Sequence, residues 1–431
     1  MNYSKNDFSI NKSKIKKQIL NSLHTILYNI LSLIKWIAIS TIVGVVVSGF
    51  ATLFAFTINL ATNTRENNPW LLFCLPIGGV LIVAIYTLCG MKKDRGTNLV
   101  LSSICHDDNV PLRMAPLIFI GTAITHLFGG SAGREGAALQ IGGSIGNALA
   151  HIFKIDEYDK KVIIMCGMSA AFAAVFGTPM AAAIFSIEVI SIGVMYYAAL
   201  VPCIFSAIIA STFASNMGIN PERFKIDAIV NLSLVNVGKV ILLALVCALV
   251  SALFCHLLHI VPKIYSRLFK NHYLRIIIAS ILIIFINVIL NTNDYQGAGI
   301  EVIDKAMNGN ALPYAFFIKM LLTALTIGAG FKGGEIIPTF FIGATLGCSL
   351  GNILGISPSL CAALGMIGLF CGVTNCPITS ALISFELFGY HAISFFLIVI
   401  SISYMMSGYS GLYKDQKILY GKTKAKYLNL K

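Results

Sequence analysis

Two adjacent charged residues, Arg134 and Glu135, stand in a glycine-rich stretch of an otherwise apolar chain; residues 129–146 read GGSAGREGAALQIGGSIG. A helix that begins inside a membrane leaves its first backbone N–H groups without partners, and its dipole adds positive potential there. Such a start can hold a small anion, and glycine lets the backbone approach it closely. We therefore predict that the amides of Gly136 and Ala137 bind an anion whose place Glu135 can take. Protonation would release the carboxylate, so Glu135 would both gate the anion and carry a proton.

A second glycine-rich break that contains charges lies at residues 330–338, GFKGGEIIP. By the same argument, backbone amides of this segment are predicted to face the anion, namely those of Gly333, Gly334, Ile336 and Ile337. A third helix start is predicted after Gly96. Lys332 is expected to snorkel to the membrane interface. Arg134 is expected to cap local backbone or to find a structural partner, and it need not pair with Glu135, because adjacent helical residues do not face one another.

The chain contains an internal repeat. Residues 167–189 and 365–387 align without gaps at an offset of 365 − 167 = 198, which pairs Glu188 with Glu386. We infer two homologous halves, at 36–220 and 228–425. Inverted membrane repeats build transporters, with the site near the midplane where broken helices meet. Close packing through small residues explains some of the glycines, but not the charges at both breaks. The two glutamates are expected to share a structural role, such as bonding free backbone N–H groups.

Composition sets the class of protein. Of the 431 residues 57% are hydrophobic and 11% are charged, and long apolar runs recur, which predicts an all-α polytopic membrane protein. Lysines and arginines flank the spans: they gather in the first 17 residues, from residue 414 onward, and at Lys92, Lys93 and Arg95. The positive-inside rule then puts both termini in the cytoplasm of a plasma or inner membrane, and the same placement argues against a nucleic-acid partner.

The remaining segments carry simpler expectations. Residues 1–35 are predicted to form an amphipathic helix on the cytoplasmic membrane face, and no C-terminal regulatory domain is expected. The 11 cysteines are scattered and fit buried apolar positions, so neither a metal nor a cofactor is expected.

One catalytic pattern competes with transport. Residues 129–133, GGSAG, match the G-x-S-x-G nucleophile elbow, with Ser131 as nucleophile and His126 or His256 as its partner. The elbow requires a preceding strand, which the sequence does not indicate. GGSIG at 142–146 repeats the pattern, so glycine-rich helix breaks generate it readily. The chain is therefore predicted not to be an enzyme, and an intramembrane serine hydrolase is kept as an alternative.

Four segments resemble the CLC family of anion channels and proton-coupled anion antiporters, over almost the whole chain. They are GREGAALQIGGSIG (133–146), FGTPMAAAIFSIEV (176–189), GFKGGEIIP (330–338) and NCPITSALISFEL (375–387). The resemblance implies a fold of 18 helices in two inverted repeats, whose broken helices meet at a midplane anion site. It also implies a homodimer with one pore in each subunit. It puts Glu135 at the external gating glutamate.

Departures from the family pattern point to a branch. GTNLV (96–100) stands where typical members have GSGIP, so Thr97 takes the place of a chloride-binding Ser and the proline is missing. Glu188 is followed by Val189, where antiporters carry the internal proton-transfer glutamate. Glu335 is predicted to assist proton passage in its stead. These features resemble the CLC-F branch of bacterial fluoride/proton antiporters, although members of that branch commonly carry Met or Asn at the position of Thr97.

The resemblance also implies a pore tyrosine near the C-terminus. Tyr420 in KILYG is predicted to fill this place, and Tyr413 is the other candidate; for either tyrosine the alternative, which the residue type favours, is an anchor at the membrane interface. The leading interpretation is fluoride export driven by inward proton flow. A chloride channel or chloride/proton antiporter of the same fold, and a transporter of organic solutes, remain alternatives.

Overall fold

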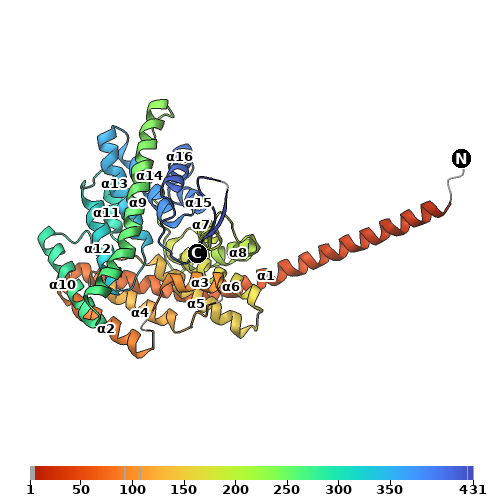
Figure 1. Ribbon diagram of the computed structural model, residues 1–431, viewed down its shortest axis with the longest axis horizontal. Helices are drawn as coiled ribbons and strands as arrows, with labels where there is room; N and C mark the ends of the chain where they lie inside the picture. Colours follow the sequence, from red (N-terminus) through yellow and green to blue (C-terminus); the bar gives the residue numbers. More distant parts are fainter. Residues whose placement is uncertain (1–4, 92–93, 107, 425, 431) are drawn as a thin grey trace.

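The computed structural model describes residues 5–91, 94–106, 108–424 and 426–430, with the backbone alone for residues 5–17. Lys92, Lys93 and Lys431 lie outside the described residues. Within them, sixteen α-helices and two 3₁₀ helices fold into a bundle with one small sheet (Figure 1). The number of helical segments is close to the 18 helices that the resemblance implies. The all-α membrane fold is confirmed.

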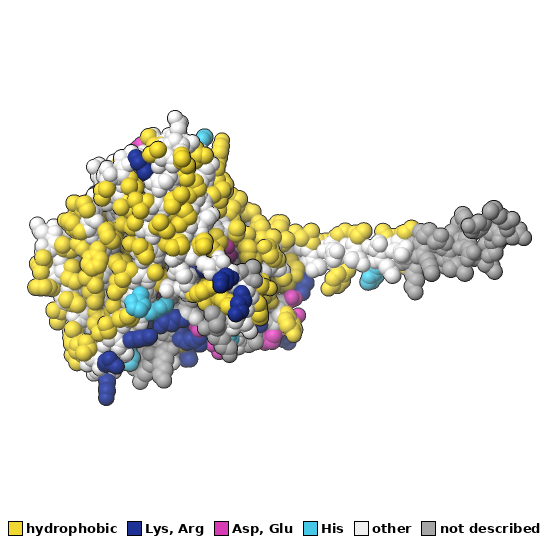
Figure 2. All heavy atoms as spheres, turned by 45° about the horizontal axis from the view of Figure 1, so that its top comes forward, with side chains coloured by type: hydrophobic (Ala, Val, Ile, Leu, Met, Phe, Trp, Pro, Cys, Tyr) yellow, Lys and Arg dark blue, Asp and Glu magenta, His cyan; other side chains and the backbone are white. Residues whose placement is uncertain are grey.

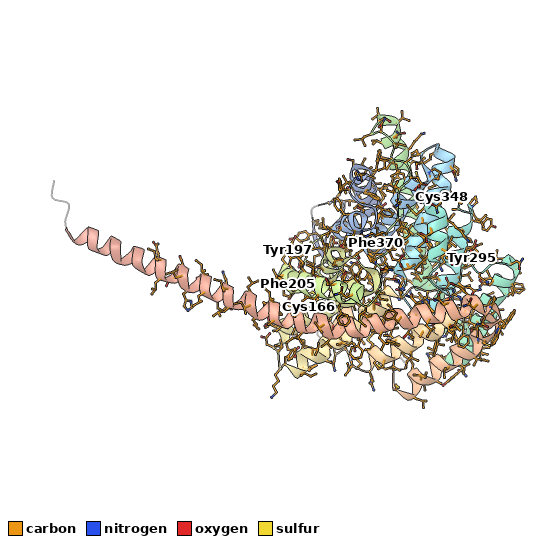
Figure 3. The ribbon with its side chains drawn as sticks, turned by 180° about the vertical axis from the view of Figure 1, so that it is seen from behind. Cys166, Tyr197, Phe205, Tyr295, Cys348 and Phe370 are labelled. Atoms are coloured by element: carbon orange, nitrogen blue, oxygen red, sulfur yellow. The ribbon has the colours of Figure 1, made fainter. Side chains whose placement is uncertain are left out.

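The first helix, α1 (Lys5–Asn67), is 63 residues long and runs past one side of the bundle, with its N-terminal part projecting beyond it (Figure 1). No boundary falls at residue 35, where a separate amphipathic segment was expected to end. The reason lies in the local sequence: residues 1–67 contain no proline, and the first glycine is Gly44. Nothing therefore interrupts the helix before it enters the apolar bundle. Seen from behind, Cys166 of α6 lies beside α1 (Figure 3).

The two halves of the chain repeat one series of helices. In the first half these are α5 (Glu135–Ile152), α6 (Glu157–Phe176), α7 (Pro179–Glu188) and α8 (Leu200–Asn216). In the second half they are α13 (Ile336–Leu354), α14 (Pro358–Thr374), α15 (Pro377–Phe388) and α16 (Ile393–Met406). In both series a proline occupies the first position of the third helix, where its missing N–H costs nothing.

The remaining elements fill the space around these two series. The first half adds η1 (Pro69–Cys74), α2 (Leu75–Leu88), α3 (Thr97–Cys105), α4 (Met114–Leu127) and η2 (Tyr197–Ala199). The second half adds α9 (Leu234–Leu268), α10 (His272–Leu290), α11 (Ile300–Met307) and α12 (Ala315–Ala329). A three-stranded sheet near the C-terminus joins β1 (Ser191–Ile192), β2 (Lys417–Tyr420) and β3 (Tyr427–Leu430) in that order.

Glycines allow the repeated helices to pack at short range. A Cβ on Gly142 of α5 would collide with the carbonyl of Gly167 in α6, and one on Gly343 of α13 would collide with the carbonyl of Gly365 in α14. Small residues at such contacts let helix backbones approach closely, which is the usual source of attraction between helices in a membrane. The equivalent pairs therefore fix α5 on α6 and α13 on α14 as two similar units.

The outer surface is that of a membrane protein. Six helices in the described part of the chain are long and apolar enough to cross a membrane. Figure 2 shows hydrophobic side chains over most of the visible surface, with Lys, Arg and His side chains gathered along one margin of the bundle.

Two glutamates cap helices across the boundary between the halves. Glu188, at the end of α7, accepts hydrogen bonds from the backbone N–H groups of Ile378 and Thr379 in α15, at 3.0 and 2.8 Å. Glu386 of α15 accepts bonds from the N–H groups of Met180 and Ala181 in α7, both at 2.9 Å. Each carboxylate thus satisfies the free N–H groups of the opposite helix start, and the expected shared structural role is found.

Candidate functional site

The site is built where the starts of α5 and α13 meet. Gly133 and Gly334 form an antiparallel bridge, with N–H to carbonyl distances of 2.7 Å in both directions. A Cβ on Gly136 would lie 2.9 Å from the Cα of Gly334, so only glycine permits this approach. The two predicted glycine-rich breaks, which lie about two hundred residues apart in sequence, therefore form one structure.

The first turns of these helices present backbone donors. In α5 the first backbone bond runs from Ala138 N to Arg134 O at 2.9 Å, and in α13 it runs from Thr339 N to Glu335 O at 3.0 Å. The preceding amides have no partner inside their own helices, as at any helix start. Residues predicted to bind the anion occupy these positions: Gly136, Ala137, Ile336 and Ile337. Together with the helix dipoles they provide positive potential without a full charge.

Glu135 is the first residue of α5 and its side chain is 0% exposed. Its Oε2 accepts a hydrogen bond from Arg134 N at 3.1 Å, whereas its buried Oε1 has no hydrogen-bond partner among the described residues. A buried carboxylate with one unsatisfied oxygen is costly, and it is stabilised by the donors, the helix dipole and the guanidinium of Arg134 around it. This is the environment predicted for a group that competes with an anion.

Arg134 has partners that the sequence did not reveal. Its Nη1 donates to Asn59 Oδ1 at 2.8 Å, and its Nη2 lies 3.2 Å from Glu222 Oε1. Its Nε also lies 3.5 Å from Glu135 Oε1, although the adjacent residues were not expected to need each other. The contact arises because Arg134 caps the helix and is not inside it, so the spacing rule for helical side chains does not apply.

Thr97 begins α3, as predicted, after Gly96, whose φ of +57° favours glycine. The Thr97 hydroxyl lies 3.3 Å from the carbonyl of Gly136 and accepts a bond from Gln140 Nε2 at 3.2 Å. The structure therefore brings Thr97 to the start of α5, next to the predicted anion ligands.

Glu335 lines a cavity of about 420 Å³, the Glu335 cavity. The cavity also reaches Thr97, Gly333 and Tyr413, and is bordered by charged side chains of Asp94, Arg95, Lys332, Lys414 and Asp415. An acid, a hydroxyl and the glycine-rich loop of the second half thus border the same cavity. Lys332 pairs with Asp94 at 2.8 Å and does not snorkel freely.

The two candidate tyrosines lie in different places. Tyr413 is 5% exposed and lines the Glu335 cavity, and its hydroxyl has no hydrogen-bond partner among the described residues. Tyr420 lies on β2, is 44% exposed, and contacts Tyr427 with ring centroids 5.5 Å apart. Tyr420, which was predicted as an anion ligand, is therefore not among the residues of the cavity, whereas Tyr413 is.

A second cavity, of about 280 Å³, lies beside the end of α1 and is lined by Arg65, His126 and Arg134. Because Arg134 immediately precedes Glu135, this cavity comes close to Glu135, and it shares no lining residue with the Glu335 cavity. Arg65 donates to the carbonyl of His126 at 3.2 Å. Two separate cavities thus reach residues at the starts of α5 and α13.

The residues of the hydrolase pattern are arranged differently from a nucleophile elbow. Ser131 lies in the turn between α4 and α5, and no described strand precedes it. Its hydroxyl lies 3.0 Å from the Thr323 hydroxyl. His126 Nε2 lies 3.4 Å from the carbonyl of Gly133. Among the described residues, no three His, Cys, Asp or Glu side chains gather closely enough to hold a metal ion.

Sequence reasoning missed three polar residues. Gln140 bonds Thr97 from the next turn of α5; its place four residues after Gly136 in an apolar helix is the signal that could have found it. Asp94 is the single acid in the basic loop MKKDRG, two residues before Gly96. Lys319 is 0% exposed in α12 and donates to the carbonyls of Tyr295 and Gly297 at 3.1 and 2.7 Å. No motif or second charged residue stands beside Lys319 in the apolar sequence of α12, so its role could not be recognised.

Comparisons with known proteins agree on one family. A family model described as "Voltage gated chloride channel" matches residues 78–408. A "Chloride/fluoride channel protein" of Pseudomonas syringae pv. tomato is 36% identical, over 90% of this chain and 87% of the relative. The "H(+)/Cl(-) exchange transporter ClcA" of Vibrio cholerae is 25% identical, over 82% of each chain.

Solved structures agree with these sequence matches. The structure described as a "CLC-type fluoride/proton antiporter" has a TM-score of 0.86 and 33% identity, covering 90% of this chain and 99% of the other. A "slow cyanobacterial Cl-/H+ antiporter" has a TM-score of 0.72 and 20% identity, covering 87% of this chain and 93% of the other. The second likeness concerns the fold alone.

Proposed function

Because the chain belongs to the voltage gated chloride channel (CLC) family, we propose that it is a fluoride/proton antiporter that exports fluoride as protons flow inward. The observation that carries this proposal is Glu135, a fully buried carboxylate at a helix start whose free amides suit an anion. The relative described as a chloride/fluoride channel protein is 36% identical and the structure described as a fluoride/proton antiporter is 33% identical, whereas the H(+)/Cl(-) exchange transporter is 25% identical, which supports fluoride over chloride.

The mechanism follows from competition between the Glu135 carboxylate and the anion for the same backbone amides. The carboxylate of Glu135 and a small anion are both attracted by the first amides of α5 and α13, so that bound anion and ionised Glu135 exclude each other. Protonation removes the negative charge of Glu135 and lets the anion bind. When the anion leaves, its amides are free to bind the carboxylate again, so Glu135 releases its proton and the two flows are coupled.

The other predicted residues have supporting roles in this proposal. The amides of Gly333, Ile336 and Ile337 and those of Gly136 and Ala137 bind the anion. The amide of Gly334, also predicted as a ligand, is already bonded to the carbonyl of Gly133 at 2.7 Å. The Thr97 hydroxyl, which donates to the carbonyl of Gly136 in this structure, turns to donate to the anion. Glu335 borders the cavity of about 420 Å³ and moves protons between its water and Glu135. Tyr413 is the tyrosine that faces the anion, because Tyr420 lies on the exposed sheet.

The orientation is proposed from charge. The Glu335 cavity is bordered by Arg95, Lys332 and Lys414 and faces the cytoplasm, as do both termini, in accordance with the positive-inside rule. The cavity beside Arg134 then opens to the outside. The halves at 36–220 and 228–425 form the inverted repeats, and two copies of the chain pair in the plasma or inner membrane, each with its own pore.

Ion-specific flux with and without a pH gradient tests the proposed function. Purified protein in liposomes is expected to drive uphill fluoride movement when a proton gradient is imposed, and to move fluoride faster than chloride. Faster chloride flux would support the chloride channel or chloride/proton antiporter alternative. A fluoride flux that is the same with and without the pH gradient would exclude antiport. Competition by small organic acids would indicate an organic-solute transporter.

Replacement of Ser131 by Ala tests the hydrolase alternative. We expect fluoride flux to be within about twofold of wild type, because the Ser131 hydroxyl bonds Thr323 and a single neutral hydrogen bond contributes about 1 kcal/mol. A fluorophosphonate probe that labels wild-type protein but not the Ser131→Ala variant would instead reveal a nucleophile. Thr323→Val, which removes the other hydroxyl, is the control for stability.

A further inference from the structure

An ion pair between Asp94 and Lys332 joins loops from opposite halves of the chain. Lys332 Nζ lies 2.8 Å from Asp94 Oδ2, and the two side chains are 18% and 5% exposed. The same ammonium lies 4.1 Å from the ring centroid of Tyr86, where it makes a cation–π contact. Because the pair is largely enclosed, salt screens it less than it screens a surface pair, and its geometry is well held.

The second oxygen of Asp94 ties the pair to a predicted anion ligand. Asp94 Oδ1 accepts a hydrogen bond from Gly96 N at 3.0 Å, and Gly96 is the residue that caps α3 before Thr97. On the other side, Lys332 directly precedes Gly333, the first of the predicted anion-binding amides of the second half. One carboxylate therefore connects the ligand of the first half to those of the second half.

These contacts close a ring around the Glu335 cavity. Thr97 contacts the carbonyl of Gly136 at 3.3 Å, and the loop before α5 is bridged to the loop before α13 by Gly133 and Gly334 at 2.7 Å. The ion pair of Lys332 with Asp94, and the hydrogen bond of Asp94 with Gly96 N, then connect this loop to the start of α3. The link between Asp94 and Lys332 is the ionic one in this ring, and it joins two segments that the backbone bridge does not connect.

We propose that the Asp94–Lys332 pair sets the separation of the anion ligands and thereby the preference of the site for fluoride over chloride. Fluoride is smaller and more strongly hydrated than chloride, so replacing its hydration shell requires donors held close together. A looser ring suits the larger ion. Asp94 and Lys332 are thus positioning residues that act through Thr97 and the Gly333–Ile337 amides. This inference rests on the proposed function.

A neighbouring set of ion pairs, which includes two residues at the border of the Glu335 cavity, contributes no link to the ring and provides a contrast. Arg95 contacts Asp108 at 2.8 Å and Asp415 at 2.7 Å, with its side chain 45% exposed. The hydroxyl of Ser102 and the guanidinium of Arg95 lower the pKa of Asp108 below its ordinary value, so these contacts persist in mild acid. Pairs exposed to this degree contribute little to stability, and breaking them is expected to change anion preference only slightly.

The test is the ratio of fluoride to chloride flux in liposomes. Asp94→Asn keeps an acceptor for Gly96 but loses the charge, and Lys332→Gln removes the other partner. Each is expected to lower the ratio by about tenfold or more, since small displacements of ligands have effects of this size. The double variant is expected to equal the more severe single variant, because both break the same link. Lys332→Arg keeps the charge and retains most of the preference.

Two further variants separate position from charge and check specificity. Asp94→Glu keeps the charge but moves it by one methylene group. A positioning role predicts a lower fluoride-to-chloride flux ratio in this variant, whereas a purely electrostatic role predicts an unchanged ratio. Asp94→Glu also tests the positioning role if Asp94→Asn and Lys332→Gln do not fold. Lys35→Gln breaks a pair of similar length, to Asp159 at 2.7 Å, that joins α1 to α6 away from the ring. It is expected to leave the ratio unchanged.

The outcomes distinguish this inference from the function on which it rests. If wild-type protein moves chloride faster than fluoride, the proposed function itself fails. If wild type prefers fluoride and folded Asp94→Asn, Lys332→Gln and Asp94→Glu variants keep its ratio, the function stands and the positioning role is wrong. An equal fall in both fluxes at constant ratio would also contradict it, because it would show a loss of active protein and no change of selectivity.

Discussion

Replacing Glu135 with Gln is expected to abolish proton movement coupled to fluoride while leaving anion passage possible. Glutamine has nearly the shape of a protonated glutamate but cannot release a proton, so the position stays neutral and the anion has no internal competitor. Proton transfer by a positioned side chain contributes about 100-fold or more, so proton uptake should fall by about that factor. The measurement is fluoride-driven proton uptake in liposomes, followed with a pH electrode alongside a fluoride electrode.

A matched control is available for this variant. Glu157 is the first residue of α6, also at a helix start, but its side chain is 71% exposed. Glu157→Gln is expected to keep both fluxes and their stoichiometry. Unchanged proton uptake in Glu135→Gln would remove Glu135 from the coupling mechanism, even if fluoride flux remained fast.

Replacing Glu188 with Ala is expected to be among the most destabilising single changes in the protein. Glu188 is buried and accepts three hydrogen bonds, from the N–H groups of Ile378 and Thr379 and from the Thr379 hydroxyl at 2.6 Å. Removal leaves buried donors unsatisfied at about 1–3 kcal/mol each, so roughly 3 kcal/mol or more is lost in total. Thermal unfolding in detergent should show a markedly lower melting temperature.

The second half supplies the control. Glu386→Ala removes the equivalent cap, but Glu386 accepts two bonds and is partly exposed, so that water can replace it. The loss of stability should therefore be clearly smaller than that of Glu188→Ala. Equal melting temperatures for Glu188→Ala and wild type would show that these N–H groups find other partners.

Much of the site could be predicted from local sequence because its chemistry is that of backbone at helix starts. Glycines beside charges in an apolar chain located the breaks at Gly136 and Gly334. The starts of α5, α13 and α3 fall within two residues of the predicted ones. Helix starts depend on a few adjacent residues, so a linear sequence contains the information.

Contacts between distant segments could not be predicted in this way. Arg134 finds Asn59 and Glu222, and Asp94 finds Lys332, at separations that no local pattern encodes. The choice between Tyr413 and Tyr420 likewise depends on how the chain returns to the cavity after α16. Tyr420 is held away by pairing of β2 with β1 and β3, strands too short and irregular to be recognised from alternating hydrophobicity.

The reciprocal caps of Glu188 and Glu386 bear on the ancestry of the chain. A single repeat with one such glutamate would end with an unused carboxylate and begin its third helix with unsatisfied N–H groups. Two copies related by a two-fold axis would each supply what the other lacks, because such a dimer uses the same surface on both sides. The caps therefore fit an ancestor that functioned as a pair of separate, identical half-length chains.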